Sequence, residues 1–367
     1  MKNKIITISF LLVLFSLFFA NLILPDKELS YSERRRLAQL PKFELDKILS
    51  GETATAFNKY TTDQFAGREP FRAIKTFTDR NIFLKKDTNR LFWAQGGIFS
   101  IEYPLKPDKV ESMCQKLTNL TDTYFDGLDL YYSVVPDKNY FLPKEGGYLV
   151  MDYGQMVEIM RQNMPARAEY IDVFDVLTLD NYYQSDGHWR QETLKPVIDR
   201  LNSAMGLDSQ FYAANYEHRS YSPFYGAYYG QLSGMAPPDT LVWLENQVTK
   251  DAIVTSVGNR WPGELPMYYE RGLGGMDSYE LYLHGAQPLM FLENPHNTSG
   301  RELILVRDSY GSSLAPVLLE SYSKIILVDL RYITQQLLGD YIQFGGQDVL
   351  FMFSSTIINN SDTIRGE

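Results

Sequence analysis

Apolar side chains follow three patterns along this chain, and each pattern predicts a different kind of element. Residues 5–24 form a nearly unbroken apolar run without a charge. At about 1.5 Å per residue, this run is long enough to cross a bilayer core of about 30 Å. Short apolar runs that end at polar residues predict buried strands at 130–135, 170–177, 303–306, 325–328 and 349–353. Helical spacing predicts helices at 106–120, 156–160, 191–201, 314–322 and 333–342.

The order of these elements predicts the fold class. Strands alternate with helices, an order that is typical of an α/β protein with a parallel sheet and right-handed crossovers. Residues 206–300 interrupt this alternation, because they are rich in Tyr, Gly and Pro and have no clear period. We therefore expect an aromatic-rich insertion there. Its aromatic clusters at 221–229 and 261–269 suit either stacking on sugar rings or packing of the insertion over the sheet.

The N-terminal apolar run divides the chain into parts. Bulky residues stand where a signal peptidase needs small ones, so an uncleaved anchor is favoured over a cleaved signal peptide. Lysines precede the run and Lys27 with the arginines at 34–36 follows it, so charge alone leaves the orientation nearly balanced. We predict a single transmembrane anchor at 1–27, a stalk with a helical lead-in at 28–85, and a catalytic domain at 86–367.

Composition excludes several classes of function. The 367 residues include 35 Lys and Arg against 45 Asp and Glu, a net charge of −10. A nucleic-acid-binding protein needs a concentrated basic face instead. Cys114 is the single cysteine of the sequence, which rules out an internal disulfide and a paired-cysteine metal motif. We therefore predict no metal, no cofactor and no nucleic-acid partner, and a packing role for Cys114.

Ser309 is the candidate nucleophile. It lies in the block Arg307-Asp308-Ser309-Tyr310-Gly311, which follows the predicted strand 303–306 and precedes a helix. Ligands of open parallel sheets bind beyond the carboxyl ends of the strands. At such a junction the serine hydroxyl is held at a tight turn, close to the positive end of the helix dipole. The alternative is that Ser309, Ser312 or Ser313 simply caps the helix.

His188 is the candidate base, and Asp186 stands two residues before it in Ser185-Asp186-Gly187-His188-Trp189. On a loop, this spacing lets the carboxylate accept from the imidazole Nδ1 and leaves Nε2 free for a serine hydroxyl. A solvated loop pair, or a histidine bound to a backbone carbonyl, is the alternative, and a metal site needs more ligands. Together, Ser309, His188 and Asp186 supply nucleophile, base and orienting carboxylate.

These motifs resemble those of a known family. The segment Tyr182-Tyr183-Gln184-Ser185-Asp186-Gly187-His188-Trp189 is similar to the Asp-x-His-Trp motif of the DHHW proteins, which are related to alginate O-acetyltransferases of the AlgX and AlgJ type. The Ser309 block resembles the turn that contains the family's nucleophile. Shorter blocks at 32–37, 134–138 and 328–332 also resemble the family, so the likeness runs from about 30 to 360. It implies an SGNH-hydrolase-like, three-layer fold with a circularly permuted motif order, in which the Asp and His precede the Ser.

The resemblance also implies further site residues. By position, Lys138 and Asn139 correspond to the Asn block of SGNH enzymes, and Arg331 falls near the Gly block. We predict the N–H groups of Ser309 and Gly311 as oxyanion donors, with Asn139 or Arg331 assisting. Lys138 and Tyr310 complete the predicted substrate-binding set. An ion pair with Asp329 or Asp348 is the alternative role for Arg331.

Two positions depart from the family pattern. Position 187 is Gly where the family name implies a second histidine, so His188 is the single functional one. The segment Leu283-His284-Gly285-Ala286 replaces a Gly-Gly turn, which removes the expectation of an oxyanion role there.

The leading hypothesis is an O-acetyltransferase that modifies an exported or cell-surface polysaccharide through an acetyl-serine intermediate. The resemblance implies that the body lies outside the cytoplasm, where a membrane acyltransferase partner would deliver the acetyl donor. A surface esterase or deacetylase with the same triad is the second hypothesis, with water as acceptor. A non-catalytic, anchored glycan-binding scaffold of an export complex is the third.

Overall fold

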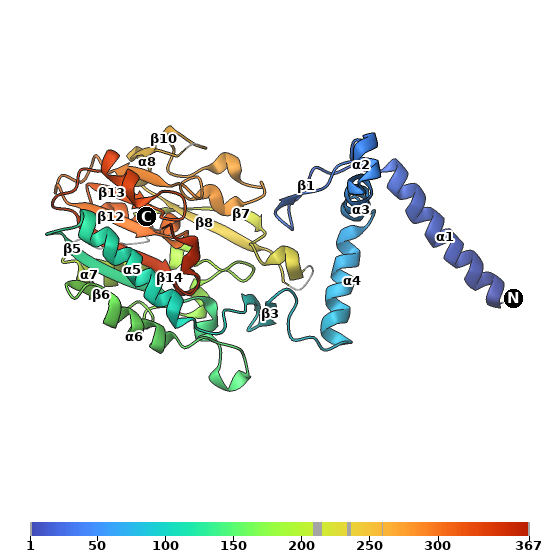
Figure 1. Cartoon of the computed structure of the whole chain (residues 1–367), viewed down its shortest axis with the longest axis horizontal. Coiled ribbons are helices and arrows are strands. Elements are labelled where there is room, and N and C mark those ends of the chain that lie inside the picture. Colours follow the sequence, from blue (N-terminus) through green and yellow to red (C-terminus); the bar gives the residue numbers. More distant parts are fainter. Residues whose placement is uncertain (1, 208–214, 233–235, 259, 366–367) are drawn as a thin grey trace.

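An eight-stranded sheet forms the centre of the computed structural model, which describes residues 2–207, 215–232, 236–258 and 260–365 (Figure 1). Of the predicted insertion, residues 208–214, 233–235 and 259 therefore lie outside the described residues. The strand order is β10-β9-β11-β13-β12-β14-β5-β6. In chain order, the strands are β5 (Asp129–Val135), β6 (Ala168–Tyr170), β9 (Ile253–Ser256), β10 (Gly263–Leu265), β11 (Leu289–Glu293), β12 (Glu302–Arg307), β13 (Lys324–Val328) and β14 (Asp348–Ser354).

The larger part of this sheet is parallel, and the predicted α/β class is confirmed. Strands β13, β12, β14, β5 and β6 pair in parallel, with Val306 of β12 in register with Val328 of β13 and Phe351 of β14. Strands β11, β9 and β10 add an antiparallel side that the sequence pattern did not predict. They come from the aromatic-rich segment, where strands of three to five residues are too short to produce a clear period.

Helices cover both faces of the sheet and make three layers. Alternate side chains of β12 belong to two separate apolar cores, Leu303 and Leu305 to one, Ile304 and Val306 to the other. The first core also contains residues of α7 (Lys195–Ala204) and α9 (Tyr310–Leu318). The second contains residues of α5 (Pro107–Tyr124) and α6 (Tyr153–Asn163), and α5 crosses in front of the sheet in Figure 1.

Some predicted elements differ from the structure. The strand predicted at 170–177 stops at Tyr170, because the Asp172 carboxylate accepts from the Phe174 N–H and turns the chain. Ile171, Val173, Phe174 and Leu177 are nevertheless buried, which explains the misleading pattern. The helix predicted at 333–342 is a 3₁₀ segment at Gln335–Asp340, and the helix predicted at 191–201 begins with a 3₁₀ turn before α7.

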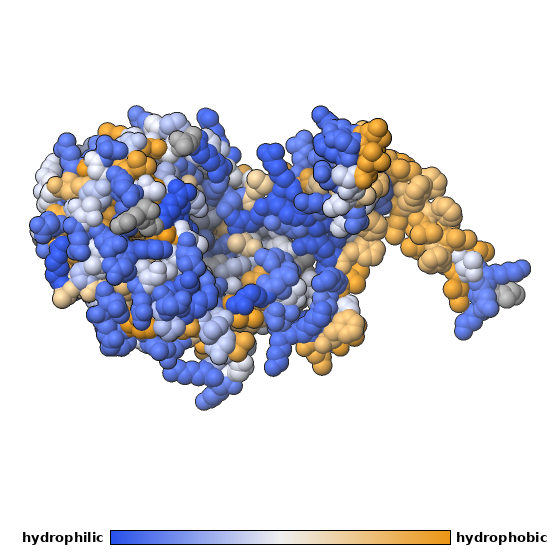
Figure 2. All heavy atoms as spheres, in the orientation of Figure 1, coloured by the Kyte–Doolittle hydropathy of each residue, from blue (hydrophilic) through white to orange (hydrophobic). Residues whose placement is uncertain are grey.

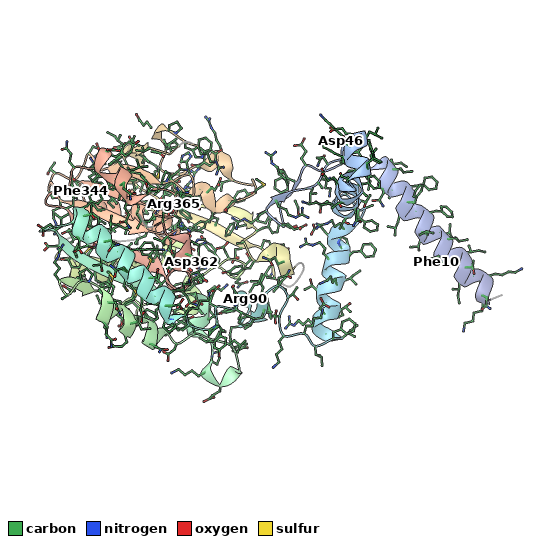
Figure 3. The ribbon with its side chains drawn as sticks, in the orientation of Figure 1. Phe10, Asp46, Arg90, Phe344, Asp362 and Arg365 are labelled. Carbon is green, nitrogen blue, oxygen red and sulfur yellow. The ribbon has the colours of Figure 1, made fainter. Side chains whose placement is uncertain are left out.

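The N-terminal part extends away from the sheet. Helix α1 (Lys2–Ile23) is long and apolar enough to cross a membrane, and none of its residues is buried in the protein (Figures 1 and 2). Phe10, labelled in Figure 3, lies on the isolated part of this helix. A hairpin of β1 (Leu29–Ser30) and β2 (Arg35–Arg36) follows. The chain then forms α2 (Leu45–Leu49), α3 (Glu52–Asp63) and α4 (Arg68–Asn81).

The remaining elements lie around the sheet. Two hairpins, β3 with β4 and β7 with β8, pair antiparallel outside it. Their bounds, with those of two short helices, are β3 (Leu91–Ala94), β4 (Gly97–Ser100), β7 (Glu217–Phe224), β8 (Asp239–Glu245), α8 (Gln247–Asp251) and α10 (Ser355–Ile358).

Candidate active site

Ser309 lies at the carboxyl end of β12, where the chain turns from the sheet into α9. Its side chain makes no capping hydrogen bond with the helix. The neighbouring Asp308 binds the first helical N–H instead, because one carboxylate oxygen accepts from the Tyr310 N–H at 3.0 Å. Its other oxygen accepts from the Ser354 N–H at 2.8 Å. The Ser309 hydroxyl is therefore available for a partner outside the helix.

His188 joins Ser309 to Asp186. Nε2 of the ring lies 2.7 Å from Ser309 Oγ, and Nδ1 lies 2.6 Å from Asp186 Oδ1. A carboxylate only accepts, so Asp186 holds a proton on Nδ1, and Nε2 accepts from the serine O–H. The structure thus brings together the three residues predicted as nucleophile, base and orienting carboxylate, in the order that a proton transfer from Ser309 to His188 needs.

The Asp186 carboxylate is fully buried, yet its surroundings keep it ionised. Burial by itself would raise its pKa. The charge and hydrogen bond of His188, the charge of Arg34 and the Ala227 N–H oppose this, and they lower the pKa of the Asp186 carboxyl well below its usual range. The Ala227 N–H donates to Oδ2 at 2.7 Å, and Arg34 Nη1 lies 3.6 Å from the same oxygen. Oδ1 is left to face the imidazole.

A buried lysine holds the loop that contains Asp186 and His188. Burial lowers the pKa of Lys138 to about 8, although the charges of Asp186, Asp239 and Asp137 act to raise it. The Lys138 Nζ donates to four backbone carbonyls, those of Ile98 at 2.7 Å, Tyr183 at 2.8 Å, Gln184 at 3.1 Å and Asp186 at 3.0 Å. Lys138 thus holds the loop of Asp186 and His188 in place through backbone carbonyls. Its role toward substrate stays a prediction.

Asp239 and Gly226 hold the opposite side of this loop. The Asp239 carboxylate accepts from the Gln184 N–H at 2.9 Å, and from the N–H and hydroxyl of Ser185 at 2.7 and 2.5 Å. At Gly226 a Cβ would lie 2.3 Å from the Ser185 carbonyl oxygen and 2.6 Å from the Asp186 Cβ. A side chain at this position would displace the loop, so glycine is required there.

Aromatic side chains enclose the imidazole and anchor it to α9. The ring of Tyr279 stacks on His188, and the ring of Tyr310 lies 5.0 Å from it at a tilt. The fully buried Trp189 donates to Ser313 Oγ at 2.9 Å, and the Tyr279 hydroxyl donates to the same atom at 3.0 Å. Rings from two distant segments therefore fix the orientation of His188 relative to the helix that follows Ser309.

The predicted oxyanion donors differ in their present partners. The Ser309 N–H has no partner among the described residues. The Gly311 N–H donates to the Asp308 carbonyl at 3.1 Å. Arg331 forms the ion pair stated as its alternative role, with Nε and Nη2 at 2.8 and 2.6 Å from the Asp329 carboxylate. Their roles toward an oxyanion stay predictions.

Asn139 and Tyr310 also have protein partners. The Asn139 side chain is buried, and its Nδ2 donates to the Ser100 carbonyl at 2.7 Å, while Oδ1 has no partner among the described residues. The Tyr310 hydroxyl donates to the Gly187 carbonyl at 2.6 Å, next to His188. Within the described part of the chain, no group of three or more His, Cys, Asp or Glu side chains is arranged to hold a metal ion.

Sequence reasoning missed Arg34, Tyr279 and Gly226. Arg34 belongs to a block that was assigned to the stalk, and nothing in its spacing connects it with Asp186. Tyr279 and Gly226 lie in the segment without a clear period. The aromatic character of that segment was the available signal. Tyr221 and Tyr225 do line a cavity of about 220 Å³, together with Tyr31 of the stalk and Ser278 beside Tyr279.

Solved structures share this architecture. A DHHW family protein from Eubacterium siraeum matches with a TM-score of 0.61 and 16% identity, over 76% of this chain and 94% of its own. The fold is that of the DHHW proteins. The resemblance to that family predicted from the sequence is thereby confirmed at the level of the fold.

Bacillus cereus PatB1 also matches the DHHW-type fold, with a TM-score of 0.59 and 16% identity, over 73% of this chain and 96% of its own. The same protein with a sulfonyl adduct gives a TM-score of 0.57. The O-acetyltransferase domain of Pseudomonas putida AlgJ matches at a TM-score of 0.42 and 13% identity, over 74% of this chain and 91% of its own. A scan against protein-family models finds no match, and neither does a search of the curated proteins.

Proposed function

We propose that this protein is an O-acetyltransferase that modifies a polysaccharide outside the cytoplasm, with Ser309 as nucleophile, His188 as base and Asp186 as orienting carboxylate. The observation that supports this most is the continuous pair of contacts from Asp186 Oδ1 through His188 to Ser309 Oγ, at 2.6 and 2.7 Å. Both distances lie within the reach that proton transfer needs.

The first half-reaction transfers the acetyl group to the enzyme. Ser309 Oγ attacks the carbonyl carbon of the acetyl donor while His188 Nε2 takes the hydroxyl proton. The imidazolium is stabilised by Asp186, and it returns the proton to the departing group as the bond to that group breaks. The product is an acetyl ester on Ser309.

The second half-reaction passes the acetyl group to the glycan. A sugar hydroxyl attacks the ester carbonyl, His188 takes its proton, and that proton returns to Ser309 Oγ as the ester bond breaks. The tyrosine-lined cavity of Tyr31, Tyr221 and Tyr225 supports a sugar acceptor, because flat rings with hydroxyls suit both faces and edges of sugars. Ser278 also lines this cavity, and the next residue, Tyr279, is the one whose ring stacks on His188.

The anchor suggests the source of the donor. Helix α1 would hold the protein at a membrane, and outside the cytoplasm acetyl-CoA is scarce. A membrane acyltransferase partner would therefore supply the acetyl group.

The test uses the full chain in detergent with 4-nitrophenyl acetate as activated donor. We expect a burst of nitrophenol and an acetyl adduct in the intact mass, both absent in Ser309→Ala. Ser312→Ala is the matched control on the same helix, because Ser312 was a rival candidate for the capping role, and it should retain both signals. A sulfonyl fluoride should label the same serine, since PatB1 has been solved with a sulfonyl adduct.

Adding an acetyl-accepting oligosaccharide distinguishes the alternatives. Transfer of acetyl to the oligosaccharide supports the transferase, whereas release of free acetate without transfer supports the esterase. The scaffold alternative predicts a different set of results. The wild type would give neither adduct nor turnover, and Ser309→Ala would leave surface acetylation in cells intact, whereas deletion of the whole chain would abolish it. These results together would mean that the protein is a scaffold and that the proposal fails.

A further inference from the structure

The hairpin that follows α1 reaches into the candidate active site. Its loop presents Arg34, whose Nη1 lies 3.6 Å from Asp186 Oδ2 and whose Nη2 forms an ion pair with the Asp277 carboxylate. The Arg34 Nε donates to the Met276 carbonyl at 3.1 Å. The guanidinium thus joins the buried carboxylate of the triad to the loop that precedes Tyr279, the ring stacked on His188.

The backbone of Arg34 is set in an unusual conformation for this contact. Its φ is +53°, in the left-handed region where Gly and Asn are the favoured residues. Such a conformation persists only where surrounding contacts hold it, and the contacts of Arg34 with Asp186 and Asp277 are of that kind. The Arg34 side chain is 17% exposed, so water screens its charge only in part.

The hairpin packs tightly against the body of the protein. At Gly230 a Cβ would lie 2.1 Å from the Ser32 carbonyl oxygen and 2.6 Å from the Glu33 Cα. The Arg72 side chain of α4 also binds the Gly230 carbonyl. The hairpin backbone therefore lies directly on the segment that contains Gly226 and Ala227, the residues that hold the Asp186 loop.

The three consecutive arginines of this hairpin have different partners. Arg35 binds the Asp63 carboxylate of α3 through Nη1 and Nη2, at 2.9 and 2.6 Å. Arg36 is exposed at the hairpin edge. Among the three, only Arg34 contacts the triad, and Arg36 offers a matched control for the same chemical change in the same hairpin.

We propose that Arg34 is a positioning residue for the triad, so that the hairpin next to the membrane anchor completes the active site; this inference rests on the proposed function. Arg34 fixes the rotation of the Asp186 carboxylate so that Oδ1 faces His188. Only residues 24–28 join α1 to the hairpin, a reach of at most about 20 Å. The reaction is thereby confined to the neighbourhood of the membrane, where a membrane-bound donor would be found.

The charges that face the pair of Asp186 and His188 determine the sign of the effect. Arg34 and the Lys138 ammonium are the cations, and Asp277 and Asp239 are the nearby anions. The rings of Tyr279 and Tyr310 and the Ser309 hydroxyl complete the surroundings. Arg34 is one of the charges that oppose protonation of the buried Asp186 and of the group paired with it. Without this charge the pair attracts a proton more strongly, so we expect activity to be lost at a higher pH on acidification.

The test measures kcat/KM with 4-nitrophenyl acetate and the rate of Ser309 labelling by a sulfonyl fluoride, between pH 5 and 9, on the full chain. In Arg34→Met we expect the acid limb of both profiles to move to higher pH. On the acid limb itself, a shift of one pH unit corresponds to a roughly ten-fold loss of rate at a fixed pH. Arg34→Lys keeps the charge and should return the limb toward the wild type. Arg36→Met should match the wild type throughout.

A second measurement does not depend on activity. The thermal unfolding midpoints of Arg34→Met, Asp186→Asn and the double variant form a cycle, in which contact between the two groups predicts effects that do not add. Profiles of Arg34→Met that coincide with the wild type, or an Arg34→Lys profile that coincides with that of Arg34→Met, overturn the inference and leave the proposed function intact. If the wild type shows no Ser309-dependent reaction, the proposed function fails, and the cycle alone then decides: additive effects overturn the Arg34 contact.

Discussion

The imidazole of His188 lies face to face with the phenol ring of Tyr279, with ring centroids 4.0 Å apart and 14° between the planes. A cation over the face of an aromatic ring is attracted by the electron density of that ring. In the proposed mechanism, His188 becomes a cation when it takes the proton of Ser309. We therefore expect Tyr279 to stabilise the transition state of that mechanism more than the resting enzyme, which is the condition for acceleration.

This relationship predicts different effects for two substitutions of Tyr279. Tyr279→Phe keeps the stacked ring and loses only the hydrogen bond to Ser313, so kcat should stay within a few-fold of the wild type. Tyr279→Leu removes the ring, and we expect kcat to fall roughly ten-fold, the equivalent of about 1–2 kcal/mol. The steady-state release of nitrophenol from 4-nitrophenyl acetate, after the burst, gives kcat for both variants. Equal losses in the two variants would contradict a role for the ring.

Asp186→Asn should leave the fold intact but lower the rate of Ser309 acylation by roughly 10⁴, because an amide can hold the wrong tautomer of His188. Burst kinetics at pH 7 give the rate, and the thermal unfolding midpoint reports the fold. Asp180→Asn is the control, an exposed carboxylate shortly before the same loop. Turnover that is unchanged in Asp186→Asn would remove this carboxylate from the mechanism.

Lys138→Met should lower both stability and activity. The substitution leaves four carbonyls without their donor, and three of these hydrogen bonds are buried. A buried acceptor without its donor costs about 1–3 kcal/mol, so we expect a loss of at least about 3 kcal/mol, which for a domain of this size lowers the unfolding midpoint by roughly 10 °C. Thermal unfolding of the exposed Lys144→Met provides the control, which should unfold within a degree or two of the wild type. If the unfolding midpoint of Lys138→Met also lay within a degree or two of that of the wild type, the supporting role of Lys138 would be wrong.

Gly226→Ala should displace the loop of Asp186 and His188. The new methyl group would lie 2.3 Å from the Ser185 carbonyl oxygen, so that carbonyl must move by about 1 Å. A displacement of this size in a catalytic group lowers the rate by about 10². The rate of Ser309 labelling by a sulfonyl fluoride measures the effect. Gly154→Ala in α6 meets only an ordinary contact at 3.4 Å, and its labelling rate should equal that of the wild type.

The sequence was informative where chemistry is local. Ser309 and its strand-to-helix junction could be predicted because a buried strand, a polar turn and a helix follow one another within a few residues. Asp186 and His188 could be paired because two positions on a loop are enough for a carboxylate to reach an imidazole. The contact between His188 and Ser309 followed from placing both segments at one edge of the sheet.

The rest of the site depends on contacts between distant segments. Arg34 contacts Asp186 although the two residues are about 150 positions apart in the sequence. The strands of its hairpin are too short to show a periodic pattern from which its position could be predicted. Tyr279 and Gly226 lie in a segment of short antiparallel strands and irregular turns, where burial and close approach decide the fold rather than alternation. The same applies to Lys138. One of its four acceptors lies in strand β4 and three lie in the loop that contains Asp186, and the sequence does not show that these segments meet.

The final prediction concerns pH and the buried Asp137, which follows β5 beneath the site. Burial is the largest influence and raises the pKa of Asp137 to about 6 from an ordinary 3.8, despite hydrogen bonds from Asn139, Tyr153 and Ser355. Between these values the folded protein binds a proton that the unfolded chain has released. The contribution of Asp137 to stability is therefore fully present below about pH 4 and is lost as the pH rises through 6.

The loss amounts to about 3 kcal/mol by pH 7. The asparagine of Asp137→Asn does not titrate, so this variant lacks the pH-dependent loss of stability. The difference between its unfolding midpoint and that of the wild type should therefore rise, in favour of the variant, between pH 4 and 7. Thermal unfolding at half-unit steps of pH measures the difference. The exposed Asp126→Asn is the control and should keep the wild-type slope. Curves for Asp137→Asn and the wild type that run parallel would mean that Asp137 is already ionised at pH 4, and that its three donors outweigh burial.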